Sequence, residues 1–281
     1  MEDQLEEILE AEAALEAAET SADDDLGLED PALEPSPLPV EGTGALRATA
    51  AVEQRPVLDL VAVGDLRGVP LWYERARAPR PARFLVARSF LPVLEATVKQ
   101  VRERAPGSFG PLQRIASAGM YVAKPGRHGE GLACDWDRLS FEHVEIAPIE
   151  RDHASRSRAT RRRYWSFAAI CRSNSCFVLH GAYDRAHGDH VHADRSTGVG
   201  FNEAPSTVEL VQSVLNEIHE AAPKLAVDGI YGPKTSAAFE RAAGRLRLDG
   251  DIHERRVFLP FLRRSARLGF AQSAAETAAS T

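Results

Sequence analysis

The run AHGDHVHAD, residues 186–194, is the feature that most limits how this chain can fold. It holds three of the nine histidines of the chain and two aspartates. Imidazole and carboxylate groups are common zinc ligands, and a catalytic zinc site usually has three protein ligands and one open position. The run therefore indicates a metal site, provided that other parts of the chain supply partner ligands. The simpler alternative is a solvated polar loop.

Suitable partners lie upstream in RHGEGLACD, residues 127–135. His128 and Asp135 are seven positions apart, which suits a loop that enters a strand with both side chains directed at one point. Gly129 and Gly131 allow the backbone to turn tightly between them. A third ligand from the downstream histidine run would complete the set.

These two segments carry a resemblance to a known family. The pattern H-x-x-G-x-A-x-D of the zinc D-Ala-D-Ala peptidases (the VanX/VanY-like group) is matched by His128, Gly131, Ala133 and Asp135. Residues 177–194 resemble the extensin-like C-terminal domain, a branch with the ending H-x-D-H-x-H-x-D. The specific motifs lie within residues 115–195, and the similarity extends over 55–204.

The resemblance implies a zinc site made by His128, Asp135 and His192. It also implies that Asp189, three residues before His192, is the general base, and that His190 belongs to an H-x-H ending. His187 is a further candidate for proton transfer. A bound zinc lowers the pKa of its water to about 7, a nearby carboxylate takes the proton, and a histidine donates to the oxyanion. A structural or silent zinc site is the alternative.

The same resemblance predicts side chains that contact substrate, namely Tyr121 and Arg127. The chain departs from the family pattern at two positions, one before each motif ligand. Gly126 stands where the family often has Ser or Thr, and Asp189 replaces the more frequent, longer Glu. The substrate arginine of the family has no clear counterpart among Lys124, Arg127 and Arg114.

The C-terminal segment 205–270 is expected to be a small module of three helices. Residues 206–222 predict a helix with Ser206 or Thr207 as its cap, and Glu209 completes a capping-box spacing from Ser206. The segment resembles the peptidoglycan-binding type 1 domain, most closely at DGIYGPKT, residues 228–235. The resemblance implies that Tyr231 lies exposed on a groove for glycan or stem peptide. A Tyr231 packed inside a plain helical unit is the alternative.

The remaining pattern predicts an α+β domain over residues 55–204, in which a small antiparallel sheet holds the zinc site. Periodicity predicts strands and helices in alternation along this segment. Strands are expected over 57–63, 113–122, 132–141, 143–149 and 176–184, and helices over 90–105 and 161–173. Residues 271–281 are expected to form a frayed, disordered tail.

Charged residues are distributed unevenly along the chain. Residues 1–54 contain 16 acidic residues against one basic residue, Arg47, whereas the remainder contains 33 basic against 25 acidic residues. We expect 1–54 to be mostly disordered, with a short amphipathic helix over 3–18. This acidic segment is either a solubilising tail or a docking element for a carrier. The basic remainder suits an anionic partner such as a wall polymer or nucleic acid, or is an evenly mixed surface.

The chain has three cysteines, and this odd number argues against a full disulfide framework. Strand alternation directs Cys134 away from the metal side on which Asp135 lies. Cys171 and Cys176 are free thiols or form one bridge, and the sequence leaves both possibilities open.

Both resemblances imply the same target. We expect a zinc metallopeptidase that cleaves stem or cross-bridge peptides of peptidoglycan, with no nucleic-acid partner. The first residues lack a secretory pattern and no apolar run is long enough to span a membrane. We therefore expect synthesis in the cytoplasm and action on the cell wall, as a phage lysin, a particle-borne enzyme or a secretion-system effector. The alternative is a silent peptidoglycan-binding protein that anchors an assembly.

Overall fold

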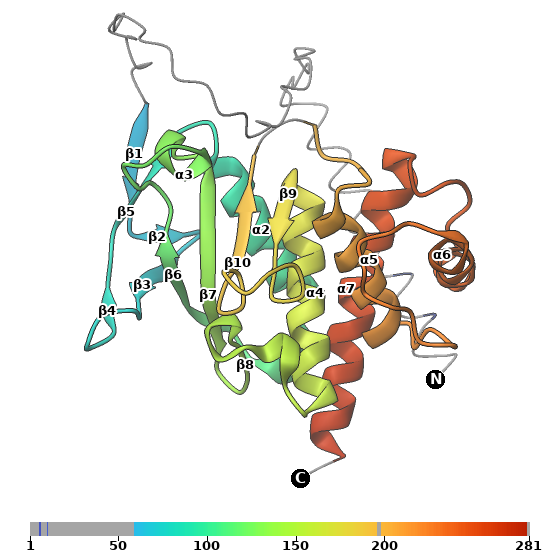
Figure 1. The fold of residues 1–281 in the computed structure, drawn as a ribbon. Helices are drawn as coiled ribbons and strands as arrows, with labels where there is room; N and C mark the ends of the chain where they lie inside the picture. Colours follow the sequence, from blue (N-terminus) through green and yellow to red (C-terminus); the bar gives the residue numbers. More distant parts are fainter. Residues whose placement is uncertain (1–5, 7–9, 11–58, 196–197, 280–281) are drawn as a thin grey trace, which may run out of the picture.

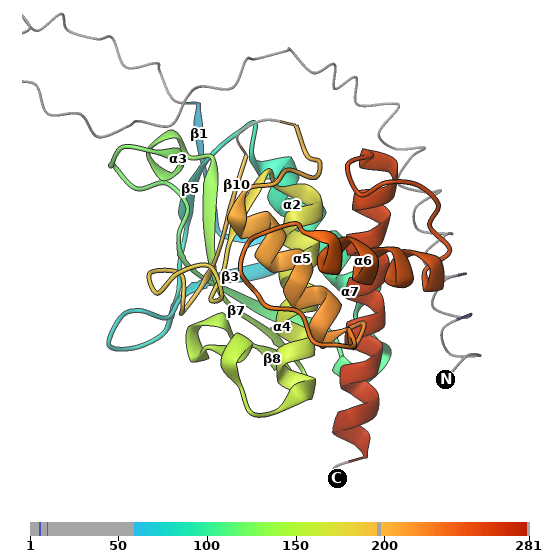
Figure 2. The same cartoon turned by 45° about the vertical axis from the view of Figure 1, so that its right-hand side comes forward.

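The computed structural model describes Glu6, Glu10 and residues 59–195 and 198–279, and its fold is shown in Figures 1 and 2. The expectations for 1–54, including the helix over 3–18 and the carrier-docking element, therefore lie outside the described residues apart from Glu6 and Glu10. Within the part that the structure describes, no helix combines the length and the apolar composition that a membrane span needs.

The fold is mixed α+β, as the sequence predicts. A central sheet has the strand order β2-β3-β6-β7-β10-β9, with β4 added beside β3 and β8 beside β7, and β1 pairs with β5 separately. The expectation of a purely antiparallel sheet is wrong at one place, since β3 and β6 run parallel. The strands are β1 Leu60–Val63, β2 Asp65–Leu66, β3 Val69–Tyr73, β4 Arg80–Pro81, β5 Phe84–Ala87, β6 Leu112–Gly119, β7 Ala133–Phe141, β8 Glu145–Ile146, β9 Phe177–Leu179 and β10 Val191–Asp194.

The α-helices stand mainly on one side of this sheet. Helix α4 lies against the strands, and α7 runs alongside α4 in both views (Figures 1 and 2). The predicted helical C-terminal region is present as three helices, α5 to α7. The helices are α2 Leu91–Arg104, α3 Arg127–Glu130, α4 Arg158–Asn174, α5 Pro205–Glu217, α6 Pro233–Arg245 and α7 Arg255–Ala278.

Helix α4 is the shared element of the fold. The Ser157 side chain caps its first turn by accepting a hydrogen bond from the Thr160 amide, 3.3 Å away. Its Phe167 ring packs edge-on against Trp136 of β7, with ring centroids 5.7 Å apart. Most residues of the helix are buried, between the sheet on one side and α5 and α7 on the other. The apolar core is therefore continuous from the sheet into the C-terminal helices.

Two buried arginines of α4 fasten the C-terminal helices to it. Arg162 donates to the Glu217 carbonyl of α5 and to the carboxylates of Glu220 and Glu276. Arg172 is fully buried, donates to the Ser175 carbonyl at 2.9 Å, and lies over the Phe258 ring of α7 at 5.1 Å. Burial lowers the pKa of Arg172 to about 10. These contacts join the two predicted units through charge-bearing hydrogen bonds as well as apolar packing.

Several boundaries differ from the sequence prediction. Helix α5 starts after Ala204, whose side chain has no acceptor, so no side chain caps the helix. The predicted cap at Ser206 or Thr207 is wrong, because the helix already begins at Pro205. Of residues 143–149, only Glu145–Ile146 is a strand. Residues 176–184 form a strand only over Phe177–Leu179, since His180 turns inward and contacts the Ser206 carbonyl.

The C-terminal tail is also more ordered than predicted. Helix α7 continues through residue 278, so the expected frayed tail over 271–281 is wrong up to that residue. The cause is packing against α4, where Arg163 donates to Ser273 and Arg162 to Glu276. Alanine, common in this stretch, has the highest helix propensity.

Gly269 is expected to be required at the crossing of α7 with α4. A Cβ atom placed there would lie 2.3 Å from the Ser166 hydroxyl and 2.8 Å from Cδ1 of Ile218. Gly269→Leu should therefore lower the free energy of unfolding by roughly 1–3 kcal/mol, as overpacking does. The matched control is Gly244→Ala on α6, where no atom lies within 4 Å. That change should be neutral or add up to about 1 kcal/mol. Urea denaturation measures both, and equal effects would contradict the expectation.

Candidate metal centre

The site begins with the pairing of β7 and β10. These strands are antiparallel neighbours, and Asp135 lies directly opposite His192. Paired residues on adjacent strands project to the same face, so the two side chains meet. Alternation sends Cys134 and Trp136 to the other face, into the core under α4. Cys134 thus lies away from the metal side, near Ser117, as predicted.

Helix α3 supplies the third side chain. It is a single turn that ends at Gly131, whose φ of 71° is in the left-handed region that glycine tolerates. A Cβ at Gly131 would also lie 2.8 Å from the Ala87 amide nitrogen, and one at Gly129 only 1.7 Å from the Lys124 carbonyl oxygen. The two glycines therefore permit the tight turn that holds His128 above the start of β7.

His128, Asp135 and His192 form a group that could hold a metal ion. His128 Nε2 lies 3.1 Å from Asp135 Oδ1 and 3.2 Å from His192 Nδ1. His192 Nδ1 and Asp135 Oδ1 are 2.9 Å apart. Four tetrahedral ligands at the usual zinc distances lie about 3.3 Å from one another. The three atoms are thus spaced for one small ion, with small adjustments.

The outward-facing ring nitrogens of the two histidines also have partners. His128 Nδ1 lies 2.6 Å from the Met120 carbonyl, and His192 Nε2 lies 3.4 Å from Asp194 Oδ2. In each case the outer nitrogen is the donor when the inner one binds a metal. Such partners fix the tautomer and the orientation of a ligating imidazole.

Asp135 and His192 each shift the pKa of the other. Burial alone would raise the pKa of Asp135, but hydrogen bonds from His128 and His192 hold it well below its ordinary value. Burial opposes protonation of His192, but Asp135 and Asp194 outweigh it and raise its pKa to about 9. Without a metal, His192 is therefore protonated at neutral pH, and a metal ion must displace that proton.

The predicted catalytic residues Asp189 and His190 lie next to the ligand group, but His190 rather than Asp189 is the nearer of the two. His190 Nδ1 is 2.9 Å from Asp189 Oδ1, and His190 Nε2 is 3.6 Å from Asp135 Oδ1. The His190 ring therefore lies between Asp189 and the ligand group. Asp189 makes its second contact with Arg75, at 3.0 Å.

His187 lies at the edge of the same group. Its ring centroid is 5.2 Å from that of His190 and 5.9 Å from that of His192. Asp184 accepts from the backbone amide of His187 and contacts its Nδ1 at 2.7 Å. Burial lowers the pKa of His187, so that its neutral form prevails at pH 7.

The predicted substrate-contacting residues are more scattered. Tyr121 is half-buried beside the site, and its amide donates to the Leu85 carbonyl. Arg127 is half-buried and forms an ion pair with Glu130 at 2.7 Å. Tyr231 lies in the C-terminal region, half-buried, with its ring 5.2 Å from that of Phe201.

Four residues of the site were not predicted from the sequence. Asp137 and Asp194 lie two positions beyond Asp135 and His192, so strand alternation places them on the same face and could have identified them. Asp184 lies three residues before His187. Arg75 is on the loop between β3 and β4, and nothing in the local sequence indicates it.

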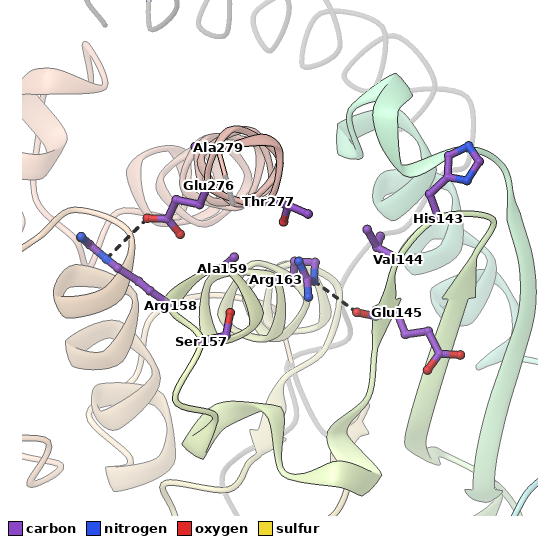
Figure 3. Close-up of a pocket in the computed structure, with 10 residues that line it drawn as sticks. All are labelled: His143, Val144, Glu145, Ser157, Arg158, Ala159, Arg163, Glu276, Thr277 and Ala279. Carbon is purple, nitrogen blue, oxygen red and sulfur yellow. Dashed lines mark hydrogen bonds and ion pairs between the residues drawn. The ribbon is translucent and has the colours of Figure 1, made fainter. Parts of the chain in front are cut away.

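A hollow on the described part of the chain lies away from the metal group. Figure 3 shows it between the start of α4, the end of α7 and the β7–β8 turn. It has a volume of about 820 Å³ and lies by β8, whereas α3 and the metal group lie at the start of β7 (Figure 1). Its arginines have partners, since Arg158 pairs with Glu276 and Arg163 donates to the Glu145 carbonyl. No ligand of the metal group lines it.

Comparison with known proteins adds no constraint, because no family model, curated protein or solved structure matches the chain.

The three-residue group should bind one divalent metal ion per chain. His128→Ala, Asp135→Ala and His192→Ala should each abolish tight binding, because two ligands hold an ion far less well than three. His143→Ala is the control, since its side chain is 59% exposed and lies in the β7–β8 turn. Metal content after dialysis checks this, and full occupancy in all three variants would contradict the site.

Metal binding should release protons and strengthen with pH. Because the pKa of His192 is raised to about 9, its pairing with Asp135 and Asp194 stabilises the metal-free protein below about pH 6.5. That contribution is lost as the pH rises through 9. Apparent metal affinity should therefore increase from pH 6.5 to 9. Calorimetry in buffers of different ionisation enthalpy measures the released protons, and a buffer-independent heat would rule out this coupling.

Proposed function

We propose that the protein is a zinc-dependent peptidase that cleaves stem or cross-bridge peptides of peptidoglycan. One observation carries the proposal: two histidines and an aspartate converge within 3.2 Å, beside an imidazole that an aspartate holds. Two nitrogen ligands and one carboxylate suit zinc, whereas calcium and magnesium prefer all-oxygen sites. When bound, zinc would polarise the scissile carbonyl and acidify a water molecule.

In this proposal His190 is the general base. Its Nε2 faces the metal group, and Asp189 fixes its tautomer by accepting from Nδ1. This is the arrangement of an aspartate-oriented histidine base. Asp189 then orients the base instead of taking the proton itself, which revises the role that the family resemblance implied. The proton taken from water passes from His190 Nε2 to the leaving amine.

We propose that His187, whose ring neighbours those of His190 and His192, acts on the oxyanion. Asp184 orients it in the same way that Asp189 orients His190. The neutral ring that prevails at pH 7 carries its proton on Nδ1, toward Asp184. Its Nε2 would therefore donate to an oxyanion only after taking up a second proton during the reaction. The site thus has two imidazoles, each held by its own aspartate.

The proposed substrate class is supported by the two sequence resemblances and by the residues at the rim of the site. Val122 and Tyr183 are 43% and 39% exposed, and Tyr183 contacts the His187 ring. With Tyr121 and Arg127 they offer apolar and cationic contacts for an anionic peptide. We propose that the C-terminal region, including Tyr231 on the connection between α5 and α6, binds the same polymer and raises the local substrate concentration. Release as a lysin or delivery through 1–54 also remains a proposal.

Digestion of purified peptidoglycan should separate the two possible bases. His190→Gln should lower kcat by about 10²–10⁴, the usual contribution of a general base. Asp189→Asn should lower it by a smaller factor, of about 10–100, as for other supporting residues. Both variants should keep their zinc. Mass spectrometry of released fragments measures the rates and identifies the bond.

Two results would change this picture. A larger loss for Asp189→Asn than for His190→Gln would restore Asp189 as the base. If the wild type holds zinc and binds the wall, but frees no peptide termini from several peptidoglycan types, a silent wall-anchoring role replaces the peptidase.

A further inference from the structure

Arg75 links the central sheet to the histidine loop. It lies between β3 and β4, and its guanidinium makes four hydrogen bonds to two aspartates. Nε and Nη2 donate to the two carboxylate oxygens of Asp137, at 2.9 and 2.7 Å. Nη1 donates to Asp189 Oδ2 at 3.0 Å, and Nη2 also donates to the Asp189 carbonyl at 3.1 Å.

The contact with Asp137 anchors one end of this link. The Asp137 side chain is completely buried and lies on the same face of β7 as the metal ligand Asp135. A buried carboxylate without a partner is costly, so Arg75 is held firmly against β7.

The contact with Asp189 uses the other side of the guanidinium. The Asp189 side chain is 41% exposed, so packing alone does not fix it. Arg75 holds both its side chain and its carbonyl. The remaining oxygen, Oδ1, is thereby directed to His190 Nδ1 at 2.9 Å. A continuous series of contacts runs from the buried strand through Arg75 and Asp189 to the imidazole that faces the metal group.

We propose that Arg75 is a positioning residue, which transfers the rigidity of β7 to Asp189 and so sets the orientation of His190. This inference rests on the proposed function in one respect only, that His190 has a role in catalysis. The geometric part stands alone, because it concerns the order of the loop over residues 184–190. Lysine cannot replace Arg75, because a single ammonium group lacks the planar fork that reaches both carboxylates.

The test separates positioning from charge neutralisation. Arg75→Gln leaves Asp137 buried and unpaired, so loss of stability alone would explain any defect. The informative variant is Arg75→Gln with Asp137→Asn, which removes both charges and keeps hydrogen-bonding side chains of similar size. Arg88→Gln is the matched control, since Arg88 pairs with Asp59 on the surface and both side chains are more than two-thirds exposed.

The full-length, zinc-loaded proteins are compared in thermal stability, zinc content, hydrogen–deuterium exchange of 184–190 and peptidoglycan cleavage. The double variant should regain the stability lost in Arg75→Gln and keep its zinc. Its amides over 184–190 should nevertheless exchange faster, on the order of tenfold, as expected for a locally opened segment. Its kcat should fall by about 10–100-fold with KM little changed. Arg75→Lys should show the same faster exchange, and Arg88→Gln should match the wild type.

Wild-type exchange and kcat in the stable double variant would overturn the proposal and leave Arg75 with charge neutralisation only. Faster exchange with unchanged kcat in a cleaving enzyme would also overturn the link to His190. If the wild type cleaves no peptidoglycan, the proposed function fails, and exchange over 184–190 alone decides whether Arg75 orders the loop.

Discussion

The antiparallel register between β7 and β10 is the constraint on which the rest of this structure depends. It sets Asp135 opposite His192 and, by alternation, sends Cys134 and Trp136 into the core beneath α4. A slip of one residue would exchange the two faces of the strand, and would bury charge where the core needs apolar surface. The ligand group and the hydrophobic core are thus two results of one pairing.

The candidate metal group was the part of the site easiest to predict from the sequence. Three residues of two types, histidine and aspartate, lie in two short motifs, and the spacing of His128 and Asp135 fits the single turn of α3. The role of Asp189 was harder, because which side chain faces the metal depends on the course of the loop. Arg75 was beyond prediction, since 62 residues separate it from Asp137 and only the tertiary fold joins them.

The fold was predicted unevenly for similar reasons. Long periodic segments such as α2 and α4 were recognised, because an amphipathic pattern identifies a helix that packs on one side. The last turns of α7 have few large apolar residues, and they are helical because Ser273 and Glu276 contact arginines of α4. The start of α5 depends on Pro205, whose fixed φ decides between neighbouring cap positions.

The close approach of α7 to α4 at Gly269 has a consequence for how such a chain can evolve or be engineered. A domain that a flexible linker joins to its neighbour, with few contacts between them, can be moved as an independent unit. Here a cut before Pro205 would remove every hydrogen-bond acceptor given above for the buried Arg162. Arg172 would lose Thr207 and the Phe258 ring but would keep the Ser175 carbonyl. Moving the C-terminal helices would therefore require moving α4 with them, and α4 packs against Trp136 of β7 next to the candidate metal group.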